Sequence, residues 1–145
     1  MRLVDFVPFI PEILLALASF VLLLSGAASR RTGARSSTLL VLVALVVTGA
    51  AVLLVGRPAA GPEVILGGML VVDQMAVFFK LLFLLAAALG MVMSASFLDR
   101  FGYRAGEYGA LLLTATLGMF VMASGANLAS LYVGLELMAL SVYVL

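Results

Sequence analysis

The chain alternates between long apolar runs and short polar linkers. Five runs are long enough for bilayer-spanning helices, which need roughly 20 apolar residues to cross about 30 Å of hydrocarbon. The five runs cover residues 9–28, 38–56, 75–98, 108–124 and 127–145. Each is expected to be helical, because lipid offers no hydrogen-bond partner to free backbone groups. The runs lack the polar alternation of β-barrel strands. The pattern therefore predicts an all-α integral membrane protein with five transmembrane helices in a single membrane domain, 1–145.

The charges in the linkers predict an orientation. The first linker, residues 29–37, holds three arginines, and the third, residues 99–107, holds two. The opposite side holds only Arg2 and Arg57. By the positive-inside rule, the first and third linkers face the cytoplasm and the N-terminus lies on the outer side.

The second linker differs from the others, because two short apolar runs flank Gly67 and Gly68. Paired glycines accept the positive φ that a two-residue hairpin turn needs. A small hairpin on the outer face and a loop lying on the membrane surface both fit this pattern.

The amino-acid composition excludes several classes of function. The chain has 145 residues, of which 66% are apolar and 10% charged, against about 45–50% and about 25% in soluble domains. A soluble enzyme or binding domain is therefore excluded. The net charge of +1 gives no basic footprint for nucleic acid. The chain has neither Cys nor His, which excludes Cys/His zinc sites, Cys-ligated iron–sulfur clusters, His-ligated haem and His-based triads. We expect no metal and no cofactor in this chain.

Glu136 is the strongest candidate for chemistry. It lies nine residues after Asn127, so about 13–14 Å into a hydrocarbon core about 30 Å thick. An ionisable residue at that depth is costly, and its default interpretation is functional. Low-dielectric surroundings favour the protonated carboxyl, and a nearby cation favours the carboxylate. Glu136 is thus a candidate proton-transfer residue; the alternative is a neutral acid that bonds to another helix.

Helical spacing separates two faces around Glu136. Tyr132 and Tyr143 share its face, where their hydroxyls could hold water or bond the carboxyl. A smaller face is suited to close helix contact and consists of Ser130, Gly134 and Ser141. A second stripe of small residues comprises Ala110, Thr114 and Gly118, and we interpret it as packing as well.

Two further charges lie inside apolar runs. Lys80 is about five residues into the third run, and Asp73 lies seven residues earlier. The simpler interpretation is that Lys80 snorkels toward the interface or Asp73; the other is that it supports a proton path. Glu12 follows Pro11 and is interpreted as a favourable charge at a helix N-terminus.

Several segments carry a family resemblance. They are RAGEYGALL (104–112), ATLGM (115–119), LYVGLELMALSVYVL (131–145), DQMAVFFK (73–80) and PEILL (11–15). Together they resemble the subunit N family of bacterial NADH–quinone oxidoreductase (respiratory complex I), one of the antiporter-like membrane subunits. Subunits of cation/proton antiporters and of membrane-bound hydrogenases share this glutamate pattern and stay open as alternatives, as does a purely scaffolding role.

The resemblance implies a proton-translocating subunit of an enzyme complex. In the family, the glutamate of the fifth span, which matches Glu136, works with lysines on later spans. The chain is then expected to be an N-terminal fragment of a larger helical bundle. NADH, flavin, iron–sulfur clusters and quinone are expected in other subunits, with no redox chemistry in this chain. Expected partners are other membrane subunits, lipid and protons, in the bacterial inner membrane.

Overall fold

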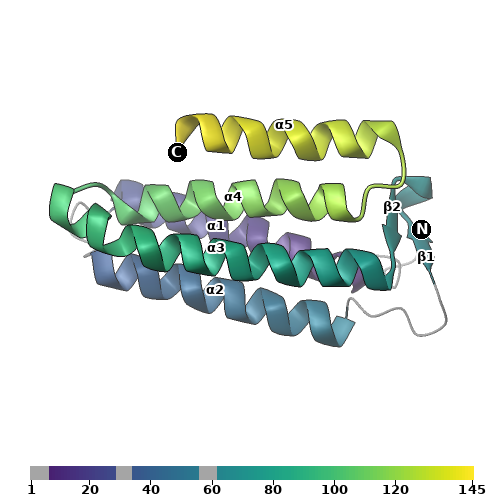
Figure 1. Cartoon of the computed structure of the whole chain (residues 1–145), viewed down its shortest axis with the longest axis horizontal. Helices are drawn as coiled ribbons and strands as arrows, with labels where there is room; N and C mark the ends of the chain where they lie inside the picture. Colours follow the sequence, from purple (N-terminus) through teal and green to yellow (C-terminus); the bar gives the residue numbers. More distant parts are fainter. Residues whose placement is uncertain (1–6, 29–33, 56–61) are drawn as a thin grey trace.

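The computed structural model describes residues 7–28, 34–55 and 62–145 (Figure 1). Within them the chain is helical apart from one small hairpin. The helices are α1 (Ile10–Ala28), α2 (Ala34–Val55), α3 (Gln74–Phe101), α4 (Ala105–Ala123) and α5 (Leu128–Val144). The predicted all-α membrane class is confirmed. The observed ends lie within four residues of the predicted ones; the largest difference is at α2, which begins at Ala34 rather than 38.

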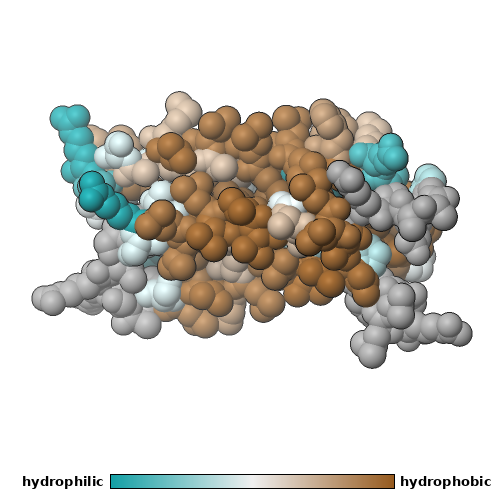
Figure 2. Space-filling model, turned by 90° about the horizontal axis from the view of Figure 1, so that it is seen from below, coloured by the Kyte–Doolittle hydropathy of each residue, from teal (hydrophilic) through white to brown (hydrophobic). Residues whose placement is uncertain are grey.

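The helices have the surface expected of membrane spans. By length and composition, α1 to α4 can each cross a membrane. The apolar α5 has 17 residues, the short end of the spanning range of about 17–25. Large apolar side chains point outward, among them Val46, Leu54 and Met93, and the face in Figure 2 is largely hydrophobic. Lipid solvates such side chains, so their exposure carries no penalty in a bilayer.

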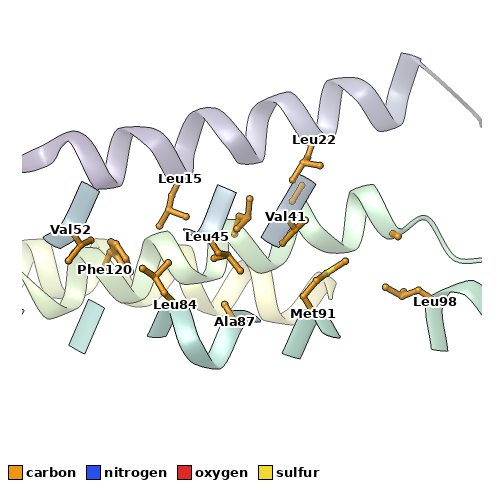
Figure 3. Close-up of a cluster of buried hydrophobic side chains, with 13 residues drawn as sticks. Leu15, Leu22, Val41, Leu45, Val52, Leu84, Ala87, Met91, Leu98 and Phe120 are labelled. Atoms are coloured by element: carbon orange, nitrogen blue, oxygen red, sulfur yellow. The ribbon is translucent and has the colours of Figure 1, made fainter. Parts of the chain in front are cut away.

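α4 occupies the centre of the bundle. It contacts α1, α2, α3 and α5, whereas α5 packs chiefly on α4 (Figure 1). Small residues allow these close approaches: a Cβ added to Gly109 would lie 2.4 Å from Cγ2 of Val41 on α2. The four helices α1 to α4 enclose an apolar core. It includes Leu15, Leu22, Val41, Leu45, Val52, Leu84, Met91 and Phe120 (Figure 3).

Local capping sets where α3 begins and ends and where α5 begins. The Asp73 carboxylate accepts a hydrogen bond from the Ala76 N–H at 2.6 Å and starts α3. Gly102, in the left-handed conformation, ends that helix. Asn127 and Ser130 form a capping box at the start of α5. Such caps satisfy the backbone donors and acceptors that the helix itself leaves unpaired.

The hairpin interpretation of the second linker is correct, but the predicted two-residue turn is wrong. β1 (Glu63–Ile65) and β2 (Leu70–Val72) pair antiparallel. Ile65 pairs with Leu70, so four residues connect the strands, including the 3-10 turn η2 (Leu66–Gly68). Leu66 joins the two glycines at positive φ, which lengthens the turn beyond the glycine pair.

The hairpin closes one end of the bundle, which we call the hairpin end. The Val71 N–H donates to the Ser124 carbonyl at 2.8 Å, and the Ala126 N–H donates to Met69 at 2.9 Å. The α4–α5 linker therefore pairs with the free edge of β2. Apolar side chains beneath the hairpin form a small cluster of Ile65, Leu70, Val72, Phe9, Leu66 and Val121.

The opposite end gathers the described basic linker residues. Arg35 and Asp99 line one cavity there, and Arg104 forms an ion pair with Glu107. The described residues of the first and third linkers thus lie at one end, as their predicted common side requires. Which side of the membrane this is remains a prediction, and Arg2, Arg30, Arg31 and Arg57 lie outside the described residues.

Candidate functional site

Glu136 lies midway along α5, about 12 Å from its first residue at 1.5 Å per residue. Its side chain is half-buried. At about 100° per residue it is turned about 200° from Gly134, and Gly134 is buried against α4. Glu136 therefore projects from the side of α5 opposite α4, toward space that the described helices leave open.

The α4–α5 contact fixes this orientation. A Cβ on Gly118 would lie 2.6 Å from the Met138 nitrogen and 2.7 Å from the Gly134 carbonyl oxygen. A Cβ on Gly134 would lie 2.8 Å from the Gly118 carbonyl oxygen. The backbones thus touch at a pair of glycines, as in close-packed membrane helices. Ser130 and Ser141 are buried on the same side, so the predicted contact face of α5 is correct.

The two tyrosines share the outward side of α5 with Glu136. The Tyr132 side chain, 61% exposed, lies one turn before Glu136 on the same side of α5, close enough to interact electrostatically with its carboxyl group. Tyr143 is 84% exposed and lies seven residues from Glu136, about 10 Å along the axis. The structure thus brings Tyr132 to Glu136 and leaves Tyr143 beyond direct reach.

Lys80 does not snorkel, so the simpler sequence interpretation is wrong. Its Nζ lies 2.6 Å from Oε1 of Glu12, and both side chains are at most 4% exposed. Asp73, the alternative partner, is occupied in capping α3. Lys80 Nζ also lies 5.7 Å from the ring centroid of Phe120, within the range of a cation–π contact. A buried ion pair thus joins α1 to α3 near the hairpin end.

Sequence reasoning missed this pair because it treated Glu12 as a simple helix-end charge. A signal was present. In the predicted topology the first and third spans run in the same direction. The first span carries the acidic Glu12 and the third the basic Lys80, each one to two turns from its outer end. When two such opposite charges lie in neighbouring helices, their attraction offsets part of the free-energy cost of removing each of them from water. Only the observed packing shows that these two helices bring them together.

Comparison with known proteins agrees with the resemblance found in the sequence. No family model matches the chain. It is 45% identical over 141 residues to NADH-quinone oxidoreductase subunit N of Parvibaculum lavamentivorans, covering 97% of this chain and 29% of that protein. It is 53% identical over 78 residues to subunit N 1 of Koribacter versatilis, covering 54% of this chain and 15% of that protein. For subunit N of Moorella thermoacetica the identity is 49% over 82 residues, 57% of this chain and 17% of the relative. The chain thus spans less than a third of the length of these curated relatives.

Proposed function

We propose that this chain, a relative of the subunit N proteins of NADH–quinone oxidoreductase over nearly its whole length, is part of a proton-translocating membrane subunit of that complex. Glu136 is the proton-transfer residue. The translocase activity is a property of the whole complex, to which this chain contributes proton transfer and no redox step. The supporting observation is the outward, mid-helix position of Glu136 with Tyr132 beside it.

The chemistry follows from the surroundings of Glu136. A carboxyl group in an apolar segment holds a proton when no cation is near and releases it when a cation approaches. The Tyr132 hydroxyl, one turn away on the same side of α5, is placed to donate to the carboxylate and to stabilise the deprotonated form. The open side of α5 is where a helix outside the described bundle would bring the controlling charge. Lys80 is paired with Glu12 and is not the partner of Glu136 in the described bundle.

The rival scaffolding role requires Glu136 to bond across to another helix. Among the described residues its side faces away from α4, the helix on which α5 packs. The close α4–α5 contact is made instead by glycines. This favours proton transfer over a lock between α4 and α5. The antiporter and hydrogenase alternatives differ in the complex that hosts the chain, not in the role of Glu136.

The test is Glu136→Gln in the full-length protein within its complex. Gln keeps the size of Glu but cannot carry the proton. We expect proton pumping and the coupled quinone reduction to fall at least about 100-fold, a typical contribution of a positioned acid–base group, while the complex still assembles. Glu107→Gln, which removes an exposed carboxyl at the start of α4, is the control. Normal pumping by the Glu136→Gln complex would refute the proposal.

A further inference from the structure

A cavity of mixed polarity lies between α2 and α3, at the end of the bundle opposite the hairpin. Its volume is about 370 Å³, within the range of about 300–1,000 Å³ that is usual for ligand sites. Its wall consists of Arg35, Thr38, Leu39, Ala95, Ser96 and Asp99. All six belong to α2 and α3, so a site here does not depend on the role proposed for Glu136 on α5.

The packing of α2 against α3 brings the two charged residues to one level. The helices run antiparallel (Figure 1), and a Cβ on Gly49 would lie 3.6 Å from Cδ1 of Leu84. Arg35 precedes Gly49 by 14 residues, and Asp99 follows Leu84 by 15, which is about 21–23 Å along each axis. This register explains why an arginine of one helix and an aspartate of the other line the same cavity.

The wall of the cavity changes from charged to apolar along the two helices. Arg35 and Asp99 are exposed at its outer end. Leu39 lies one turn further into the bundle on α2, and Ala95 lies one turn further in on α3. Ser96 places a hydroxyl group between these two levels. The cavity therefore has a charged outer part and an apolar inner part.

Apolar side chains continue from the inner part along the outside of both helices. At helical spacing, Val46 follows Leu39 on α2 and Val92 follows Ala95 on α3, and both valines are exposed. Figure 2 shows the same division, since hydrophilic side chains gather at the two ends of the molecule and hydrophobic ones cover its middle. A molecule bound here meets charge first and then a hydrocarbon surface, which is the order of groups in a phospholipid.

The two charges of the cavity lack ion-pair partners in the part of the chain that the structure describes. Each also stands at the helix end that disfavours it. Arg35 lies in the first turn of α2, and Asp99 lies in the last turn of α3, whereas helix dipoles favour anions at the first turn and cations at the last. Neither local helix stability nor an ion pair between the two accounts for both charges, but a ligand with one anionic and one cationic group balances both.

We propose that this cavity binds the headgroup of a zwitterionic phospholipid with a primary ammonium group, as in phosphatidylethanolamine. The phosphate lies on the Arg35 guanidinium, whose planar set of N–H donors matches phosphate oxygens. The ammonium group lies on the Asp99 carboxylate. The acyl chains follow the apolar surface along α2 and α3.

The pair of charges selects among headgroups. Phosphatidylglycerol brings an anion for Arg35 but no cation for Asp99, and the carboxylate repels its phosphate. Phosphatidylcholine is zwitterionic, but its quaternary ammonium has no N–H to donate to the carboxylate. Phosphatidylethanolamine satisfies both residues, so it is the preferred ligand.

The test is native mass spectrometry of the purified full-length protein, titrated separately with dioleoyl-phosphatidylethanolamine and dioleoyl-phosphatidylglycerol in detergent. The apparent Kd of the first retained lipid is measured, and we expect wild type to bind the ethanolamine lipid more tightly. Arg35→Gln should weaken that binding about ten-fold, the usual effect of losing a hydrogen bond to a charged group. Asp99→Asn should remove or invert the preference between the two lipids, because it deletes the partner of the ammonium and the repulsion of the anionic headgroup.

Arg104→Gln and Glu107→Gln are the matched controls. They remove the same types of charge at the same end of the bundle, but Arg104 and Glu107 pair with each other outside this cavity. Both controls should leave the lipid preference unchanged. All four substitutions remove charges that reach the surface, so the fold should be retained.

Three results would overturn the inference. Equal binding of the two lipids by wild type, or an unchanged preference in Asp99→Asn, would show that the ammonium group is not recognised. An unaltered Kd in Arg35→Gln would exclude the phosphate contact. Displacement of the lipid by an equal concentration of glycerophosphoethanolamine, which has the headgroup without acyl chains, would exclude a lipid site. These measurements involve no proton pumping, so their outcome is separate from that of Glu136→Gln.

Discussion

At the scale of single residues, the charges inside the apolar helices fall into two arrangements. Glu12 and Lys80 neutralise each other deep in the bundle, so their cost of burial is offset within this chain. Glu136 has no cation from the described residues beside it and faces outward with Tyr132. A charge that is neutralised inside the fold stabilises the bundle, whereas a charge on an open helix face is available to interact with a further segment.

Tyr132→Phe tests the neighbour of Glu136. Removing the hydroxyl deletes one donor to the carboxylate, and a net hydrogen bond contributes about 0.5–1.5 kcal/mol. We expect proton transfer by the complex to slow about two- to ten-fold without loss of assembly, measured as initial pumping rate in vesicles. Tyr143→Phe is the matched control on the same side of α5. Equal effects of the two variants would contradict the direct role of Tyr132.

At the scale of elements, small residues decide where helices meet. α4 contacts four other helices because its glycines and alanines let backbones approach. Gly109 lies against Val41 of α2, and Gly118 lies against the backbone of α5. The second contact turns Glu136 outward, so the packing of α5 and the exposure of the candidate site have one cause.

Gly118→Ala tests this contact. The added methyl would meet backbone atoms of Gly134 and Met138 at 2.6–2.7 Å, and backbone cannot move aside cheaply. Overpacking of this kind costs about 1–3 kcal/mol, so the thermal unfolding midpoint of the purified full-length protein should fall.

Gly90→Ala is the control for that measurement. Gly90 lies within α3, and nothing is within 4 Å of an added Cβ there. Alanine favours a helix over glycine by about 1 kcal/mol, so this variant should unfold at the same temperature or higher. A drop of the same size in both variants would argue against a specific α4–α5 contact.

At the scale of the whole molecule, the two ends of the bundle differ in character. One is closed by the hairpin, which the α4–α5 linker extends by backbone pairing. The other holds Arg35, Asp99 and the Arg104–Glu107 pair. Because positive linkers are retained on the cytoplasmic side, the hairpin and the Glu12–Lys80 pair are expected to face the outside.

Cysteine labelling tests that orientation, since this chain has no cysteine. Met69, in the hairpin turn, and Tyr103, in the third linker, are both exposed. In a cysteine-free background of the full-length protein, Met69→Cys should react with a membrane-impermeant maleimide in intact cells. Tyr103→Cys should react only in inverted vesicles. The reverse pattern would show that the topology is inverted.

The class of the protein and much of its local structure follow from the sequence alone. In lipid, a long apolar segment satisfies its own backbone hydrogen bonds by forming a helix. The five helices could therefore be predicted from hydropathy. Helical periodicity separated the side of α5 with Ser130 and Gly134 from the side with Glu136, because that geometry belongs to one helix alone. The hairpin was predictable from its glycines, although its longer turn was not.

Which charges meet depends on how the helices pack against one another. The contact of Glu12 with Lys80 joins two side chains, on α1 and α3, that lie far apart in the sequence. Their distance depends on the register between helices, which the packing of residues such as Ser19 and Gly109 sets. Periodicity within one helix carries no information on that register. A lysine that looks free along the sequence is therefore paired in the fold.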